Sequence, residues 1–161
     1  MEITFAPKGI VQINDARITF KNFSGEGSKF NREGDRNFAL VIPDEAAAEA
    51  LTAEGWNVKV KPPREEGDDP FMFMKVKVKF NDYGPNCYLI SGNSMIKLDE
   101  GSIGCLDDIR IESVSLDISP SDWEMFDGRT GRTAYLRNIK VVQDLSGDRF
   151  AAEYRSRAEA Y

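Results

Sequence analysis

The segment from Phe71 to Phe80 carries the same kind of side chain at every second position. Because side chains of an extended strand point alternately to its two faces, this period predicts a β-strand with one buried face. The face expected to be buried carries Met72, Met74, Val76, Val78 and Phe80. The opposite face carries Phe71, Phe73, Lys75, Lys77 and Lys79. The chain is therefore expected to build its fold from strands.

Three other segments, 10–23, 109–119 and 132–143, alternate in the same way but change phase part-way along. In the first of them the change falls at Asn14–Asp15. A strand that changes phase bends and passes from one wall of a fold to another, and small barrels need such bends. We therefore predict a mostly β chain, an OB-fold-like five-stranded barrel with an inserted hairpin and one helix. A β-sandwich is the competing architecture.

The sequence between residues 36 and 81 predicts the positions of one helix and one hairpin. Proline and acids at 43–45 suit a first helical turn, so we predict a helix that runs through the alanine-rich segment and ends at Gly55. It follows segment 36–42, which is apolar on both faces and is expected to be a central strand. Segments 56–61 and 71–81 flank an acidic loop and predict a hairpin.

The length of 161 residues fits a single domain. We expect that domain to cover residues 1–145 and to be followed by a polar, mobile tail over 146–161. The sequence contains no run approaching the ~20 apolar residues of a membrane helix, and its first residues lack a signal-peptide pattern. A cytoplasmic protein without a membrane partner is expected.

The amino-acid composition also argues against several kinds of catalytic and metal-binding site. The chain has two cysteines, Cys87 and Cys105, and no histidine, which argues against a zinc site and against Ser–His or Cys–His catalysis. Both thiols are expected to be free and buried. The acidic pairs Asp68–Asp69 and Asp107–Asp108 lack metal-ligand spacing, and no GxxxxGK[ST] motif is present. We expect no enzymatic activity, no metal and no cofactor.

The exposed face of the 71–80 strand has the chemistry of a single-strand binder. Two rings lead into three lysines about 6.6 Å apart, a spacing close to the phosphate repeat of an extended single strand. Cations suit phosphates and aromatic faces suit bases. Lys59 and Lys61 on the partner strand would double the row. The alternative is that these lysines solvate the outer face of an edge hairpin.

Two other segments mix aromatic and basic residues. A glycine-rich loop with its flanks supplies Lys21, Phe23, Lys29, Phe30, Arg32 and Arg36. We expect the loop to be a flap that closes over DNA, the alternative being an ordinary solvated hairpin loop. The second segment supplies Arg129, Arg132, Tyr135 and Arg137. In that segment Trp123 is expected in the core, and Asp127–Gly128 is also a plain turn signal.

Three stretches resemble one family. They are Ala16-Arg-Ile-Thr-Phe-Lys-Asn-Phe-Ser-Gly25, Arg36-Asn-Phe-Ala-Leu-Val-Ile-Pro-Asp-Glu45 and Gly131-Arg-Thr-Ala-Tyr-Leu-Arg-Asn-Ile-Lys-Val-Val142. They are similar to the OB-fold single-stranded DNA-binding proteins of tailed phages and prophages. The resemblance implies coating of single strands in phage DNA replication and recombination, without a cofactor. It names single-stranded DNA and replication or recombination proteins as partners, and leaves a homo-oligomer open. On this comparison the hairpin at 56–82 would be an insertion.

Other functions stay open at this point. The net charge of −6 argues weakly against a nucleic-acid binder, for which whole-domain basicity is usual. One alternative is a phage structural or protein-interaction module, such as a decoration protein or an inhibitor of a host protein. A metal-dependent nuclease is another. Salt-dependent binding to oligonucleotides distinguishes a single-strand binder from a structural or interaction module. Incubation of DNA with the protein and Mg²⁺ tests for nuclease activity.

Overall fold

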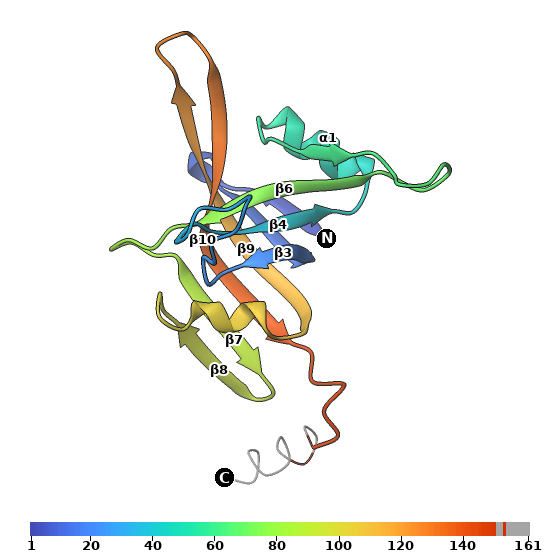
Figure 1. Cartoon of the computed structure of the whole chain (residues 1–161), viewed down its shortest axis with the longest axis vertical. Helices are drawn as coiled ribbons and strands as arrows, with labels where there is room; N and C mark the ends of the chain where they lie inside the picture. The colour runs from blue at the N-terminus through green and yellow to red at the C-terminus, as the bar shows by residue number, and fades with distance from the viewer. Residues whose placement is uncertain (151–152, 154–161) are drawn as a thin grey trace.

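Strands from the whole described part of the chain hydrogen-bond into one sheet, which Figure 1 shows. The computed structural model describes residues 1–150 and 153. The strands are β1 (Glu2–Phe5), β2 (Val11–Ala16), β3 (Ile18–Asn22), β4 (Arg36–Ile42), β5 (Lys59–Lys61), β6 (Phe71–Val78), β7 (Asn86–Ser91), β8 (Ser94–Leu98), β9 (Ile111–Glu124) and β10 (Thr130–Gln143). The helical segments are α1 (Glu45–Ala53) and the 3-10 turns η1 (Pro7–Gly9) and η2 (Ile103–Asp107).

The sheet curves into a partly open barrel because one bent segment supplies a strand near each end of the strand path, which also carries β1 outside β2. The main path of strands runs β2-β9-β10-β6-β4-β3, and only Arg17 separates β2 from β3 along the chain. β10 and β6 run parallel, whereas β2–β9, β9–β10, β6–β4 and β4–β3 pair antiparallel. With β2 and β3 counted as one bent strand, these strands form the predicted five-stranded OB-like barrel.

The predicted phase changes lie at breaks in strand pairing. Asp15 has a positive φ of 53°, and the β2–β9 register shifts between Ile13 and Ala16. The β9–β10 register shifts between Leu136 and Asn138, and again where β9 begins. Each break lets one strand turn from one wall of the barrel to the next, as the change of phase indicates.

The barrel encloses an apolar core that one face of β6 helps to line. Met74, Val76 and Val78 are at most 4 % exposed, as the alternation predicts. They belong to one buried cluster with residues from β2, β4, β9 and β10, such as Leu40 and Ile118. Each such side chain contributes about 1.5–3 kcal/mol on burial, so the core fixes the opposite face of β6 toward solvent.

The helix forms where it is predicted, between β4 and β5. The Asp44 carboxylate caps it by accepting a hydrogen bond from the Ala47 amide at 2.8 Å, and Gly55 follows its end with a φ of 89°. Leu51 anchors it in the core. No helix in the described part of the chain is long and apolar enough to cross a bilayer.

The inserted hairpin is not where the family comparison placed it. β6 pairs with both β4 and β10, so it is a barrel strand, although it does form the predicted hairpin with β5. The added hairpin is β7–β8, which attaches to the barrel through β7 and β10. It is visible beside the barrel in Figure 1. Which hairpin is the insertion depends on pairing between strands that are distant in sequence, and the alternation within one strand does not reveal such pairing.

Two further expectations need correction or lie outside the described residues. Cys87 is buried and free as predicted, but Cys105 is free and exposed. Most of the tail predicted to be mobile, namely residues 151–152 and 154–161, lies outside the described residues, so that expectation stays a prediction. The described residues before it include Asp144, whose amide donates to the Arg110 carbonyl at 2.8 Å.

Candidate nucleic-acid interface

The outer face of β6 carries the predicted row of rings and lysines. Lys75, Lys77 and Lys79 are exposed, whereas the residues between them are buried. The rings of Phe71 and Phe73 stack on one another with centroids 5.3 Å apart and planes 21° apart. Two half-buried rings therefore continue directly into a run of ammonium groups.

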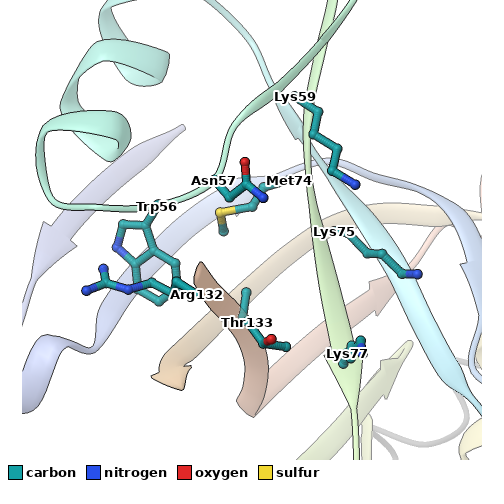
Figure 2. A pocket seen from close by; sticks show the side chains of 9 residues that line it. Trp56, Asn57, Lys59, Met74, Lys75, Lys77, Arg132 and Thr133 are labelled. Carbon is teal, nitrogen blue, oxygen red and sulfur yellow. The ribbon is translucent and has the colours of Figure 1, made fainter. Parts of the chain in front are cut away.

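Two neighbouring strands, β5 and β10, extend this face along one edge of β6. Lys59 lies opposite Phe73 and Lys61 opposite Phe71 in the β5–β6 pair, and directly opposed residues share a face. Further along the same edge of β6, Tyr135 of β10 lies opposite Lys77, while β4 pairs along the other edge. Figure 2 shows Lys59 and Lys75 extending on the same side of β6. Sequence alternation thus correctly places lysines of two strands together.

A pocket of about 340 Å³ lies at the far end of the lysine row. Lys79, Tyr135 and Arg137, all predicted site residues, line it together with Tyr83. The Tyr83 side chain is 94 % exposed, in a turn where the Tyr83 amide donates to the Asn81 side chain at 2.8 Å. Tyr83 was not predicted, because its turn sequence gave no alternation that could assign the ring to a face.

The loop between β3 and β4 holds itself together by many internal hydrogen bonds. The Asn31 side-chain amide donates to the carbonyls of Glu26, Arg32 and Asp35 at 2.9–3.1 Å. Phe30 stands out from this framework with 93 % of its surface exposed, and the Lys29 ammonium lies 5.8 Å from its ring centroid. These hydrogen bonds support an exposed ring at the loop surface, and the expected closure of the loop over DNA stays a prediction. Arg32, also exposed, forms an ion pair with Asp35 at 3.7 Å.

Three predicted site residues at the base of that loop make contacts within the fold, and for the buried Phe23 this corrects the prediction of a DNA contact. Phe23 is fully buried and stacks on Phe38 at 5.2 Å. The Lys21 ammonium donates to two carbonyls of the chain, at 2.8 and 2.9 Å. The Arg36 guanidinium pairs with Glu100 at 3.3 Å, and the Arg36 side chain is only 19 % exposed. Phe23 is therefore closed to a ligand, whereas for the partly exposed Lys21 and Arg36 a DNA contact stays a prediction.

The base of the β9–β10 hairpin also engages its predicted cations internally. Arg132 forms an ion pair with Asp122 at 2.6 Å, donates to the Glu54 carbonyl at 2.7 Å and lies 5.0 Å from the Trp56 ring centroid. The hydrogen bond from Arg132 lowers the pKa of the Asp122 carboxyl, so that ion pair persists to acidic pH. Figure 2 shows the Arg132 guanidinium beside the Trp56 ring.

The same hairpin projects beyond the barrel in Figure 1. Arg129, near its turn, pairs with Asp127 at 2.8 Å. Trp123 is 45 % exposed, so the expectation that it belongs to the core is wrong. The guanidinium groups of Arg129 and Arg132 are therefore neutralised by carboxylates, and the hairpin is a weaker candidate for phosphate contact than β5 and β6.

One family model spans almost the whole chain. The family described as "Putative phage ssDNA-binding domain" matches residues 3–158. The chain belongs to this family. Membership confirms the resemblance inferred from the sequence.

Solved structures agree with the fold of this phage ssDNA-binding domain. One is the single-stranded DNA-binding protein of bacteriophage Enc34 in complex with ssDNA, with a TM-score of 0.59, 13 % identity, and 88 % of this chain and 90 % of that chain covered. A second structure of the Enc34 protein gives a TM-score of 0.58 and 12 % identity over 88 % of this chain and 85 % of that chain. At such identity the likeness concerns the fold. No curated protein matches the chain.

Besides Tyr83, sequence reasoning missed the exposed ring of Phe20 in this phage ssDNA-binding domain. Phe20 of β3 is 64 % exposed, and its ring meets that of Phe71 edge to face with centroids 6.1 Å apart. Phe20 has the same even parity as Ala16 and Ile18, and a regular strand would place all three on one face. The β3–β4 register shifts between Thr19 and Asn22, and this bulge turns the ring outward.

Proposed function

We propose that this chain binds single-stranded DNA along the outer face of β5, β6 and β10, and that it does so without strict sequence preference. The main support for this proposal is the outer face of β6, on which two stacked phenylalanine rings continue directly into a row of lysines. Lys59, Lys61, Lys75, Lys77 and Lys79 appear in none of the ion pairs found among the described residues. Their ammonium groups are therefore available to phosphates.

The two kinds of side chain divide the work of binding. Ammonium groups replace the counterions of the DNA backbone, which makes affinity depend on salt but not on sequence. Rings such as Phe73 and Phe30 offer stacking surfaces that accept any base. The net charge of −6 repels DNA from most of the surface, so this face directs the strand to one path.

The biological setting follows from the family. We place the chain in phage DNA replication and recombination, in the cytoplasm of the host cell, where it coats single strands and meets replication or recombination proteins. The proposal assigns it no catalytic step, no metal and no cofactor. The binding chemistry described above needs only side chains of the chain itself.

Fluorescence titration tests the proposal. Trp56 lies beside the pocket that Lys59, Lys75 and Lys77 also line, so intrinsic fluorescence should respond when a strand occupies this face. We expect a clear change with oligo-dT and hardly any with the matching duplex. Equal affinity for the two would contradict a stacking mechanism. Absence of salt-dependent binding to either would favour a protein-interaction module.

A further inference from the structure

A hollow of about 600 Å³ lies at the other end of the lysine row, between β3 and the loop that joins β5 to β6. Phe71, the first ring of the row, forms part of its lining, so a strand that follows the row reaches this hollow. Other lining residues bear on what it binds: Arg17, Phe20, Lys61, Arg64, Asp68 and Asp69.

Phe20 is held above this hollow at a conformational cost. Its φ of +49° lies in the left-handed region, which is unfavourable for a bulky side chain. Burial does not compensate, because the ring is 64 % exposed and its described aromatic contact is the edge of Phe71. Strained residues that stand open to solvent cluster at binding sites. Two rings at right angles thus form a corner into which a flat ligand can stack.

The charges around this corner are mixed and unpaired. Arg17, Lys61 and Arg64 contribute cations, and Asp68 and Asp69 contribute carboxylates. None of the five takes part in the ion pairs found among the described residues. Cations suit the phosphates of an arriving strand. Carboxylates repel phosphates and only accept hydrogen bonds, so they suit a group rich in N–H donors.

We propose that this hollow receives one nucleobase of the bound strand and prefers guanine. The inference rests on the proposed function and adds base selectivity at one position. Guanine presents an imino and an amino donor side by side on its Watson–Crick edge, which one carboxylate can accept together. Thymine presents a single donor between two carbonyl oxygens, which a carboxylate repels. Stacking on Phe20 and Phe71 is common to all bases.

Short oligonucleotides test the preference. We compare oligo-dT with the same oligomer carrying one dG, and with one carrying deoxyinosine, which lacks the amino group. We expect dG to bind about five-fold more tightly than dT, the lower end of what a bidentate base contact provides. Deoxyinosine should fall between them. Equal affinity for all three would overturn the base preference while leaving single-strand binding intact, whereas no binding of any oligomer would overturn the proposed function itself.

Two variants assign the preference to the carboxylates. The double variant Asp68→Asn with Asp69→Asn should lose the preference for dG and keep or gain affinity for oligo-dT. The matched control, Glu65→Gln with Glu66→Gln, changes two acids of the same loop that do not line the hollow and should leave the preference unchanged. A preference that survives in the Asn variant, or loss of oligo-dT binding by that variant, would overturn the inference.

Discussion

Phe23 and Phe30 belong to the base and the tip of one loop, yet their surroundings are opposite. Phe23 has no exposed surface and stacks on Phe38, whereas Phe30 is 93 % exposed. Both were predicted to contact DNA on the same compositional ground. Loss of the Phe23 side chain leaves a cavity in the core, whereas loss of the Phe30 ring removes only contacts that a ligand would make.

Substitution of the two rings by alanine should therefore separate affinity from stability. We expect Phe30→Ala to weaken oligonucleotide binding by about 1–3 kcal/mol, the range for one stacking platform, without lowering the melting temperature. Phe23→Ala should lower the free energy of unfolding by about 3–5 kcal/mol and leave the affinity of the folded fraction unchanged. Titration and thermal unfolding of both variants provide the measurement, and the reverse pattern would return Phe23 to the binding face.

The two thiols differ in a way that a reagent can detect. Cys87 is buried, and burial raises the pKa of its thiol to about 12, so it stays protonated in the folded chain. Cys105 is exposed. The pKa of its thiol is nevertheless raised, mainly because the protein removes some of the water around it and secondly because the Asp108 carboxylate lies nearby. With a thiol reagent at neutral pH we expect one slow reacting group, lost in Cys105→Ser, and a second group only in denaturant.

The same burial predicts the direction of alkaline destabilisation. An unfolded cysteine ionises near pH 8.5, whereas folded Cys87 remains neutral up to a pH of about 12. Ionisation then favours the unfolded chain, so the stability contributed by Cys87 is complete below about pH 8.5 and falls as the pH rises toward 12. Denaturant unfolding at pH 7 and pH 10 measures this loss. Cys87→Ala should reduce the difference between the two pH values.

The sequence identifies residues whose chemistry suits DNA binding, but it does not show whether their side chains are exposed and free to contact DNA. Lys21 donates to the carbonyls of Leu106 and Ile109, which lie 85 and 88 residues further along the chain. Residue type and local spacing carry no information on such partners. Phe20 was missed for a related reason, because the strand bulge that exposes it interrupts the alternation that would place its side chain on one face.

At the scale of elements, β6 was the most predictable part because its pattern repeats over its full length. One buried face and one charged face follow from a period of two, and the structure has both. β9 continues past its predicted end at residue 119 to Glu124, and β10 begins at Thr130, close to its predicted start at 132, so the two strands form a hairpin whose tip has no buried face. Apolar alternation disappears there, so hydrogen bonding between the strands extends beyond any pattern the sequence shows.

Removal of charge from β6 should change how affinity depends on salt. If the face contacts about four phosphates, log K should fall against log salt with a slope of about −3, because each phosphate contributes about 0.7. The triple variant Lys75→Gln, Lys77→Gln and Lys79→Gln should flatten that slope by about two. It should fold normally, since the three side chains are exposed.

A control with equal charge makes this assignment specific. Lys8, Lys97 and Arg149 are also exposed but lie off β5, β6 and β10. Their replacement by glutamine changes the net charge equally and should leave the slope almost unaltered. Equal flattening in both triple variants would mean that total charge, not the β6 face, governs binding.

At the scale of the whole molecule, an acidic chain binds a polyanion only where its shape separates the charges. The barrel does this by fixing β6 between β4 and β10, with β5 alongside, so that lysines scattered in sequence share one face. Hollows bound this face at both ends, one with Phe20 and one with Tyr83. The path for a strand is therefore limited in length, with a ring at each end.

That limit predicts how affinity depends on oligonucleotide length. From Phe71 to Lys79 the strand rises about 26 Å at about 3.3 Å per residue, which is room for about four or five extended nucleotides with one phosphate near each lysine. In a series of oligo-dT of increasing length, affinity per oligomer should therefore rise steeply up to about five or six nucleotides. Beyond that, longer strands gain only through the number of overlapping positions at which one protein can bind. A steep rise that continues past about ten nucleotides would mean that the strand leaves β6 and wraps onto further surface. In that case the triple lysine variant of β6 would shorten the range of lengths over which affinity rises steeply, and it would not lower the affinity equally at all lengths.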